Sequence, residues 1–227
     1  MLEIVKTADG SNTIYNAEVG ENYHSKHGAL QESRHVFLNS GLKYFFSPTR
    51  GDLERARISI LEVGFGTGLN FLLSAEHCDE KGIELNYTGI EAYPLSPEMI
   101  SQTGYEQYLQ PQTWNSFIEK YPDCLKAETG ITAQCKLQIA HCKLLDFRSE
   151  KQYNLIYFDA FAAMYQPEMW DETAIAHTIK FLKPGGVFVT YAITGNLKRA
   201  VKALGCKVEK APGAPGKREM LRAVKTL

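Results

Sequence analysis

Three glycines with alternating spacing are the first residues of this sequence that suggest chemistry. Gly64, Gly66 and Gly68 follow a run of mostly apolar residues in the segment ISILEVGFGTGLNF, which spans positions 58–71. This pattern predicts a strand, a tight turn and a helix. Because glycine has no Cβ, the backbone N–H groups of such a turn can approach a ligand closely, and the following helix N-terminus attracts anions. The ligand of such a turn is a dinucleotide pyrophosphate, a nucleoside triphosphate or the amino-acid end of S-adenosylmethionine.

The residues around the turn distinguish these ligands. Leu69 occupies the place of the third glycine in the dinucleotide-binding pattern, and no Gly-Lys-Ser/Thr follows to form the phosphate loop of an NTPase. Glu62, just before the turn, repels a pyrophosphate but suits a sulfonium or an ammonium group. The turn therefore favours S-adenosylmethionine, and we predict that Glu62, the three glycines and Asn70 contact this cofactor.

Two further carboxylates follow predicted strands. Glu91, in YTGIEAYPL, ends the second strand, where a carboxylate can accept hydrogen bonds from both hydroxyls of an adenosine ribose. We predict that Glu91 and Ala92 contact the cofactor, although nicotinamide-binding folds use the same device. Asp159, in YNLIYFDAFAAMYQPEMW, ends the fourth strand at the sheet edge where such folds bind ligands, and Phe161 follows it. A carboxylate there is either a helix cap or the partner of an acceptor amine beside a methyl donor.

Strand and helix patterns alternate along most of the chain, which predicts an α/β protein with a mostly parallel sheet and helices on both faces. Strands are expected at 58–63, 84–90, 135–140, 153–158, 187–193, 207–210 and 218–224, and helices at 68–77, 168–182 and 196–204. Asp9-Gly10 predicts a hairpin turn, and a helical region follows that ends near Ser47-Pro48. The run from Lys183 to Gly186 predicts another tight turn. We therefore expect an N-terminal extension over 1–50, packed on a core domain over 51–227 with a helical insertion near 105–132.

The composition is that of an ordinary globular protein. The 227 residues are 44% hydrophobic and 22% charged, and no apolar run approaches the roughly 20 residues that span a bilayer. The first residues lack the apolar core of a signal peptide, so we expect a cytoplasmic protein with no membrane partner. The five cysteines form no CxxC pair, which predicts reduced thiols and no metal site.

Charge is unevenly distributed, although the net charge is only −1. From Lys198 to the end there are nine Lys/Arg and two Glu, a local balance of +7. This segment is either a phosphate-facing patch or the solvated surface of a final helix and strand. The candidates for phosphate contacts are Lys198, Arg199, Lys217 and Arg218.

The chain also resembles one family closely, through the segments EVGFGTGLNF, GIEAYPL, FDAFAAMYQPEMW, LKPGGVFVTYAITGNLKRAV and PGKREML. This family comprises the methyltransferases that finish the aminomethyl group on the wobble uridine of certain bacterial tRNAs. It includes the methyltransferase half of bifunctional MnmC and the freestanding form MnmD. The likeness extends from about Tyr23 to Leu221 and includes YHSKHGALQESRHVFL near the start. The glycine turn is generic, whereas the Asp-x-Phe-Ala…Pro-x-Met-Trp run and Gly-Lys-Arg-Glu-Met-Leu are specific.

The resemblance implies a Rossmann-like class I fold and S-adenosyl-L-methionine as methyl donor. The implied acceptor is the primary amine of 5-aminomethyl-uridine, 2-thiolated or not, in the anticodon stem-loop of tRNA. The companion oxidase of MnmC does not fit in 227 residues, so methyl transfer alone is expected, with a separate oxidase or an upstream tRNA-modification enzyme as a possible partner. The implied roles are catalysis and cofactor contact for Asp159, and substrate contact for Tyr23 and Phe161. The Phe161 ring either stacks on the uracil or packs in the core.

Two departures from the family pattern affect the site. The usual Asp-Gly-Phe-Ala-Pro is Asp-Ala-Phe-Ala-Ala here, at residues 159–163. The acidic residue that usually follows the third strand and reaches the adenine is replaced by His141 and Cys142, with Asp146 as an alternative contact. Two other functions stay open. One is a methyltransferase of the same fold that acts on a small amine or a protein; the other, less favoured, is a nicotinamide-dependent oxidoreductase.

Overall fold

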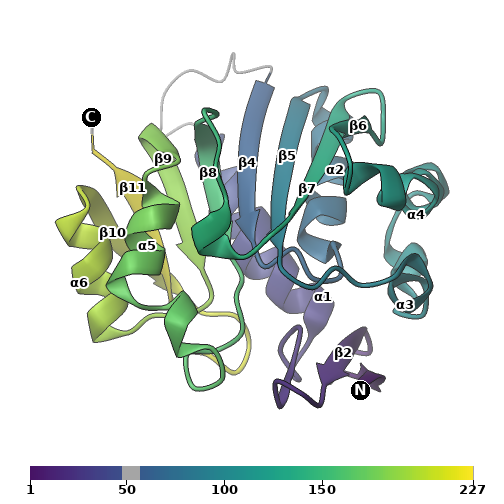
Figure 1. Ribbon diagram of the computed structural model, residues 1–227, viewed down its shortest axis with the longest axis horizontal. Coiled ribbons are helices and arrows are strands. Elements are labelled where there is room, and N and C mark those ends of the chain that lie inside the picture. The colour runs from purple at the N-terminus through teal and green to yellow at the C-terminus, as the bar shows by residue number, and fades with distance from the viewer. Residues whose placement is uncertain (48–56, 227) are drawn as a thin grey trace.

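An eight-stranded sheet forms the centre of the computed structural model, which describes residues 1–47 and 57–226 (Figure 1). Along the sheet the strand order is β10-β11-β9-β8-β4-β5-β7-β6. The strands are β4 (Arg57–Val63), β5 (Glu84–Glu91), β6 (Thr129–Gly130), β7 (Cys135–His141), β8 (Tyr153–Phe158), β9 (Leu182–Thr190), β10 (Cys206–Pro212) and β11 (Glu219–Lys225). The mostly parallel sheet predicted from the sequence is confirmed.

The position of the site follows from the strand order. β4 pairs in parallel with both β5 and β8, and β7 and β9 extend the parallel part on either side. The chain runs from β4 outward to β7 and then returns to β8, so the strand order reverses between β4 and β8. Ligands of such sheets bind at the carboxyl ends of the strands beside this reversal. β11 lies antiparallel between β9 and β10, and β6 lies antiparallel to β7.

Helices cover both faces of the sheet, because its central strands are apolar on both sides. Consecutive residues of β8 enter two separate cores: Leu155 and Tyr157 pack on one face, and Ile156 and Phe158 on the other. The first core is covered by η1 (Ser33–Lys43), α2 (Leu69–Lys81) and α4 (Pro111–Cys124), and the second by α5 (Glu172–Ile179) and α6 (Gly195–Ala203). The shorter helices are α1 (Ala29–Glu32), α3 (Pro97–Ser101), η3 (Tyr105–Tyr108), η4 (Leu144–Asp146) and η5 (Pro167–Met169).

The N-terminal residues form a small sheet of their own. β1 (Leu2–Lys6) pairs with β2 (Asn12–Asn16), and β2 pairs with β3 (Glu21–Asn22), all antiparallel. The predicted hairpin at Asp9-Gly10 is therefore confirmed, and this sheet lies at the end of the molecule toward which β4 and β5 run (Figure 1). The helical region that follows ends at Phe45, close to the expected Ser47-Pro48, whereas the expected boundary at residue 50 lies outside the described residues.

Two expectations about elements were wrong. The helix expected over 168–182 is α5 alone, preceded by the single turn η5, and β9 already begins at Leu182. The tight turn expected from Lys183 to Gly186 is instead an irregularity inside β9, where the register against β8 shifts between Tyr153 and Leu155. Gly185, with φ of 72°, allows the bulge without a break in the strand. Among the described residues, no helix is long and apolar enough to cross a membrane.

Candidate active site

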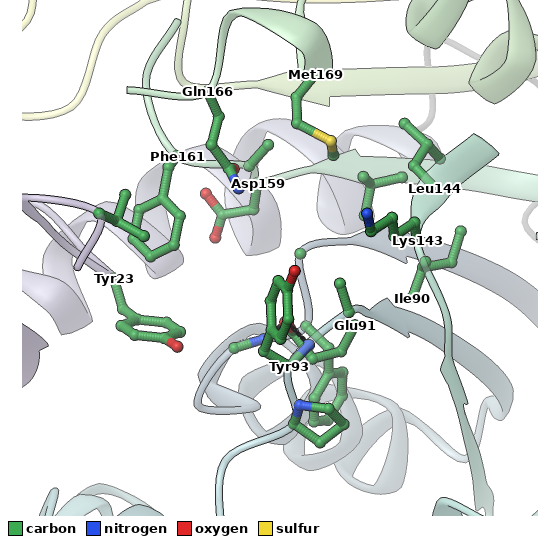
Figure 2. A pocket seen from close by; sticks show the side chains of 18 of the residues that line it. Tyr23, Ile90, Glu91, Tyr93, Lys143, Leu144, Asp159, Phe161, Gln166 and Met169 are labelled. Carbon is green, nitrogen blue, oxygen red and sulfur yellow. Dashed lines mark hydrogen bonds between the residues drawn. The ribbon is translucent and has the colours of Figure 1, made fainter. Parts of the chain in front are cut away.

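A cavity of about 1170 Å³ opens at the carboxyl ends of β4, β5 and β8. Its volume exceeds the roughly 300–1,000 Å³ usual for one small-molecule site, which leaves room for a cofactor and an acceptor group together. Figure 2 shows Tyr23, Phe161 and Asp159 on one side of this cavity, Ile90, Lys143 and Leu144 on the other, and Glu91 and Tyr93 between them. The predicted site residues that line the cavity are Tyr23, Gly64, Gly66, Glu91, Ala92, His141, Cys142, Asp159 and Phe161.

Two glycines of the turn, Gly64 and Gly66, line the cavity. Gly64 has φ of 83°, and a Cβ there would lie 2.5 Å from the backbone oxygen of Asp159. Gly66 has φ of 53°, and its Cβ would lie 2.9 Å from the ring of Tyr23. Both positions therefore require glycine for backbone conformation and for close approach. Gly68 does not line the cavity; it precedes α2 and packs against Phe65 and Phe117.

Glu91 connects the end of β5 to this turn. One carboxylate oxygen accepts a hydrogen bond from the Gly66 N–H at 2.9 Å, and the other accepts one from the Tyr93 N–H at 3.0 Å. The half-buried carboxylate is thus fixed at the cavity wall beside the turn. This is the arrangement expected of a group that accepts hydrogen bonds from ribose hydroxyls while the turn holds the amino-acid end of the same ligand.

Glu62 and Asn70 lie behind the cavity wall, so the expected direct contact of these two residues with a cofactor is not what the structure shows. The Glu62 carboxylate is fully buried and accepts hydrogen bonds from Asn70 Nδ2 and from the Tyr87 hydroxyl, both at 2.8 Å. Asn70 Nδ2 also donates to Asp159 Oδ2 at 2.8 Å. The Asn70 amide group therefore bridges the carboxylates of Glu62 and Asp159. Glu62 influences the site only indirectly, by holding the Asn70 side chain that contacts Asp159. The sequence pattern placed both residues near the turn but did not give the direction of their side chains.

Asp159 is the carboxylate that reaches the cavity from β8. Burial raises its pKa to about 8, nearby Glu32 adds to this effect, and the hydrogen bond from Asn70 opposes it. Burial, with Asp159 nearby, also raises the pKa of Glu62 well above its ordinary value. Two buried carboxyl groups that share one amide donor favour states in which at most one is ionised. The site therefore holds a carboxyl that can exchange a proton near neutral pH.

Phe161 is half-buried and faces the cavity, which favours contact with a ligand over a purely core role. Its ring meets that of Tyr23 edge to face, with centroids 5.1 Å apart. Its backbone oxygen accepts a hydrogen bond from Trp170 Nε1 at 2.7 Å. The preceding Ala160, where the family pattern has glycine, is 5% exposed, and its oxygen accepts a hydrogen bond from the Tyr191 hydroxyl at 2.9 Å.

The opposite wall carries residues that the motifs only partly identified. His141, Cys142 and Asp146 all line it, so each of the three candidates for adenine contact lies at the cavity. Lys143 and the exposed Tyr93 also line the cavity, but the sequence analysis did not identify them. Tyr93 follows Glu91 by two residues, and that spacing at a strand end was the available signal.

The four basic candidates do not line the cavity. Arg199 and Arg218 are exposed and Lys198 is half-buried, so these three can still face phosphates. Lys217 is different: its Nζ lies 2.8 Å from the buried Glu32 carboxylate and 3.8 Å from the centre of the Tyr191 ring. Lys217 is therefore a weaker candidate for a phosphate contact than the other three, because Glu32 already neutralises its charge.

S-adenosylmethionine fits the residues present. The turn offers backbone N–H groups at the start of α2, Glu91 offers a fixed carboxylate, and the cavity continues from them to Asp159. No observation in this region favours a pyrophosphate, whose charge the carboxylates would repel.

Comparison with known proteins agrees with this geometry. A family model described as S-adenosyl-L-methionine-dependent methyltransferase matches residues 106–226. Curated relatives include the tRNA 5-methylaminomethyl-2-thiouridine biosynthesis bifunctional protein MnmC of Marinobacter nauticus, 31% identical over 220 residues, and that of Idiomarina loihiensis, 32% identical over 216. These alignments cover 90% and 88% of this chain but 34% of each relative, so the chain spans about a third of their length.

Solved structures support the fold. MnmC2 from Aquifex aeolicus superposes with a TM-score of 0.75 at 24% identity, covering 98% of this chain and 70% of that one. A methyltransferase from Pyrococcus furiosus gives a TM-score of 0.52 at 17% identity, covering 93% and 91%. The Rossmann-like class I fold expected from the sequence is thereby confirmed.

Proposed function

Because the chain belongs to a family of S-adenosyl-L-methionine-dependent methyltransferases, we propose that it methylates the primary amine of a 5-aminomethyl group on the wobble uridine of tRNA. The product is the 5-methylaminomethyl nucleoside, with or without a 2-thio group. The names of the MnmC relatives support this substrate, as they refer to the biosynthesis of tRNA 5-methylaminomethyl-2-thiouridine. The observation that carries the proposal is the Asp159 carboxyl, which faces the cavity beside the glycine turn and Phe161.

The cofactor, when bound, supplies an electrophilic methyl group on a sulfonium. The turn at Gly64 and Gly66 binds its amino-acid end, and Glu91 binds its ribose hydroxyls. Asp159 accepts a hydrogen bond from the acceptor amine and aligns the nitrogen for in-line attack, a geometric effect that can contribute several orders of magnitude in rate. Phe161 stacks on the pyrimidine ring.

The environment of Asp159 also suits it to proton transfer. An ordinary carboxylate, with a pKa near 4, is a poor base for an alkylammonium, whose pKa is roughly 10. Burial raises the pKa of Asp159 to about 8, which brings it much closer to that of the amine. A positioned base with a matched pKa contributes about 10²–10⁴-fold. In its ionised form, which predominates above about pH 8, Asp159 therefore both orients the amine and accepts its proton.

The partners follow from this substrate. Lys198, Arg199 and Arg218 contact phosphates of the anticodon stem-loop. A separate oxidase or another upstream modification enzyme supplies the aminomethyl group. The protein acts in the cytoplasm, where its tRNA substrate is found.

The direct test is methyl transfer from labelled S-adenosylmethionine to tRNA isolated from cells that lack this protein. Nucleoside mass spectrometry should show loss of the aminomethyl nucleoside and gain of its methylated product. Pretreatment of the tRNA with nuclease should abolish incorporation. Incorporation that survives nuclease would instead identify a small amine or a protein as the acceptor.

A further inference from the structure

The backbone of residues 159–162, which we call the acceptor loop, is held by three side chains, one from nearby in the sequence and two from more distant segments. The Tyr191 hydroxyl donates to the Ala160 oxygen, and Trp170 Nε1 donates to the Phe161 oxygen. On the opposite side the Ala162 N–H donates to Glu21 Oε2 at 2.7 Å. Each of the three residues after Asp159 therefore makes one backbone hydrogen bond to a side chain, and the Ala162 oxygen also accepts from the Tyr165 and Gln166 N–H groups.

Glu21 is the partner that comes from the N-terminal sheet. It sits in β3, where Glu21 pairs with Asn16 of β2, and the Tyr23 N–H donates to the Ile14 oxygen at 2.9 Å. The same segment meets the region of the acceptor loop twice more. The Tyr23 ring packs on Phe161, and a Cβ on Gly20 would lie 3.5 Å from the ring of Tyr165. The N-terminal sheet thus forms part of the wall that carries Asp159 and Phe161.

We propose that Glu21 is a positioning residue of the active site: by accepting the Ala162 N–H it fixes the acceptor loop, and with it the directions of Asp159 and Phe161. For the identity of the acceptor this inference rests on the function proposed above. Glu21 does not react with the substrate. Its contribution is geometric, since a misplacement of about 1 Å in a reacting group can cost roughly 100-fold in rate.

The Ala162 N–H requires a hydrogen-bond acceptor at residue 21, and this acceptor need not be charged. Burial raises the pKa of Glu21, while the hydrogen bond from Ala162 acts in the opposite direction. A glutamine has nearly the same length and offers a carbonyl oxygen to the Ala162 N–H. An alanine offers none, and it leaves the half-buried N–H without its partner. Glu21→Gln should therefore preserve the loop, and Glu21→Ala should release it.

The test compares E21A, E21Q and the wild type by four measurements: steady-state methylation of tRNA, affinity for S-adenosylhomocysteine, hydrogen exchange of the Ala162 amide, and melting temperature. E21A should lower kcat at least tenfold, leave the Kd for S-adenosylhomocysteine within about twofold, and lose protection of the amide. E21Q should restore kcat to within about threefold and restore the protection. Glu3→Ala is the control, because Glu3 is an exposed glutamate of the same sheet and should behave as the wild type.

Two results would overturn the inference. One is an E21A variant with wild-type kcat and an equally protected Ala162 amide. The other is an E21A defect that E21Q does not rescue, or that reduces cofactor affinity and thermal stability in parallel, which indicates a general structural role. If the wild type itself fails to methylate tRNA, the proposed function fails, and the hydrogen-exchange comparison alone decides the role of Glu21.

Discussion

The two sides of the cavity are built in different ways. The cofactor side comes from three adjacent strands and one turn: β4, the glycine turn, the end of β5 at Glu91 and the end of β7 at His141. The acceptor side depends on the N-terminal sheet, on α2 through Asn70, on the segment after β9 through Tyr191, and on Lys217 near the C-terminus. The cofactor side is thus built from a local sequence pattern that recurs in many proteins, whereas the acceptor side is built from segments that lie far apart in the sequence.

This difference suggests that cofactor binding and substrate choice depend on different parts of the chain. A local, backbone-based site binds a common cofactor with little dependence on the rest of the molecule. Because the acceptor side is assembled from remote segments, a substitution in one segment can change it without changing the others. We therefore expect the acceptor side to determine which substrate is bound. Changes on the acceptor side should then affect turnover, and changes on the cofactor side should affect cofactor affinity.

The largest effect is expected for Asp159→Asn. The amide keeps the shape of the side chain but can neither carry the negative charge nor accept a proton, so kcat should fall by about 10²–10⁴-fold. The Kd for S-adenosylhomocysteine, measured by calorimetry, should stay within about threefold, because Asp159 belongs to the acceptor side. Turnover equal to that of the wild type would remove Asp159 from the mechanism.

Gly64→Ala tests the place where the two sides touch. The added Cβ would lie 2.5 Å from the Asp159 backbone oxygen, at a φ of 83° that alanine rarely adopts. We expect cofactor affinity to fall about tenfold or more, with a lower melting temperature. Gly82→Ala is the matched control: its φ is 65°, but its Cβ meets nothing within 4 Å, so it should show the strain without the loss of affinity. An equal loss in both variants would contradict this account.

Asn70→Ala removes the amide that bridges Glu62 and Asp159. Two buried carboxyl groups each lose a hydrogen bond, so we expect a loss of about 2 kcal/mol in the free energy of unfolding, measured by urea denaturation, and a roughly tenfold fall in kcat. Asn39→Ala, at an exposed helical asparagine, should change neither quantity. Intact turnover in Asn70→Ala would show that Asp159 is oriented without this bridge.

The raised pKa of Asp159 predicts a pH dependence of stability. Between the ordinary carboxyl pKa near 4 and the folded value of about 8, the native state holds a proton that the unfolded chain has released. The stabilisation is complete below pH 4 and is lost as pH rises to about 8, with a slope of at most about 1.4 kcal/mol per pH unit from this group. Asp159→Asn should flatten the dependence of the free energy of unfolding on pH, measured by chemical denaturation. An unchanged slope would assign this pH dependence to other groups such as Glu62.

The smallest effect is expected at the exposed basic residues outside the cavity. Replacing Arg218 by alanine should reduce the log–log dependence of tRNA affinity on salt by about one unit and leave cofactor binding unchanged. Lys217→Ala should differ, since it leaves the buried Glu32 without its ion pair and should reduce stability instead. The comparison of filter-binding slopes with melting temperatures separates the two residues. Equal salt slopes for Arg218→Ala and the wild type would place the RNA elsewhere.

The sequence predicted the cofactor side better than the acceptor side for a physical reason. A strand, a glycine turn and a helix are local patterns, so the positions of Gly64, Gly66 and Glu91 could be read directly from their neighbours. Asp159 could be found because it ends a strand. Glu21 carries no such signal, as a glutamate after a turn is usually solvated, and only the fold brings it to Ala162. The pairing of Lys217 with Glu32 joins residues 185 positions apart, so the sequence shows the positive charge at Lys217 but not its partner.

The position of β11 has a consequence for how the protein matures. This strand, which follows β10 in the chain, inserts between β9 and β10, and the loop before it delivers Lys217 to Glu32. A nascent chain can form the glycine turn long before residues 217–225 leave the ribosome, yet the cavity wall around Asp159 stays incomplete until then. Because contacts of such high sequence separation form slowly, catalytic competence should arise as a late step in folding.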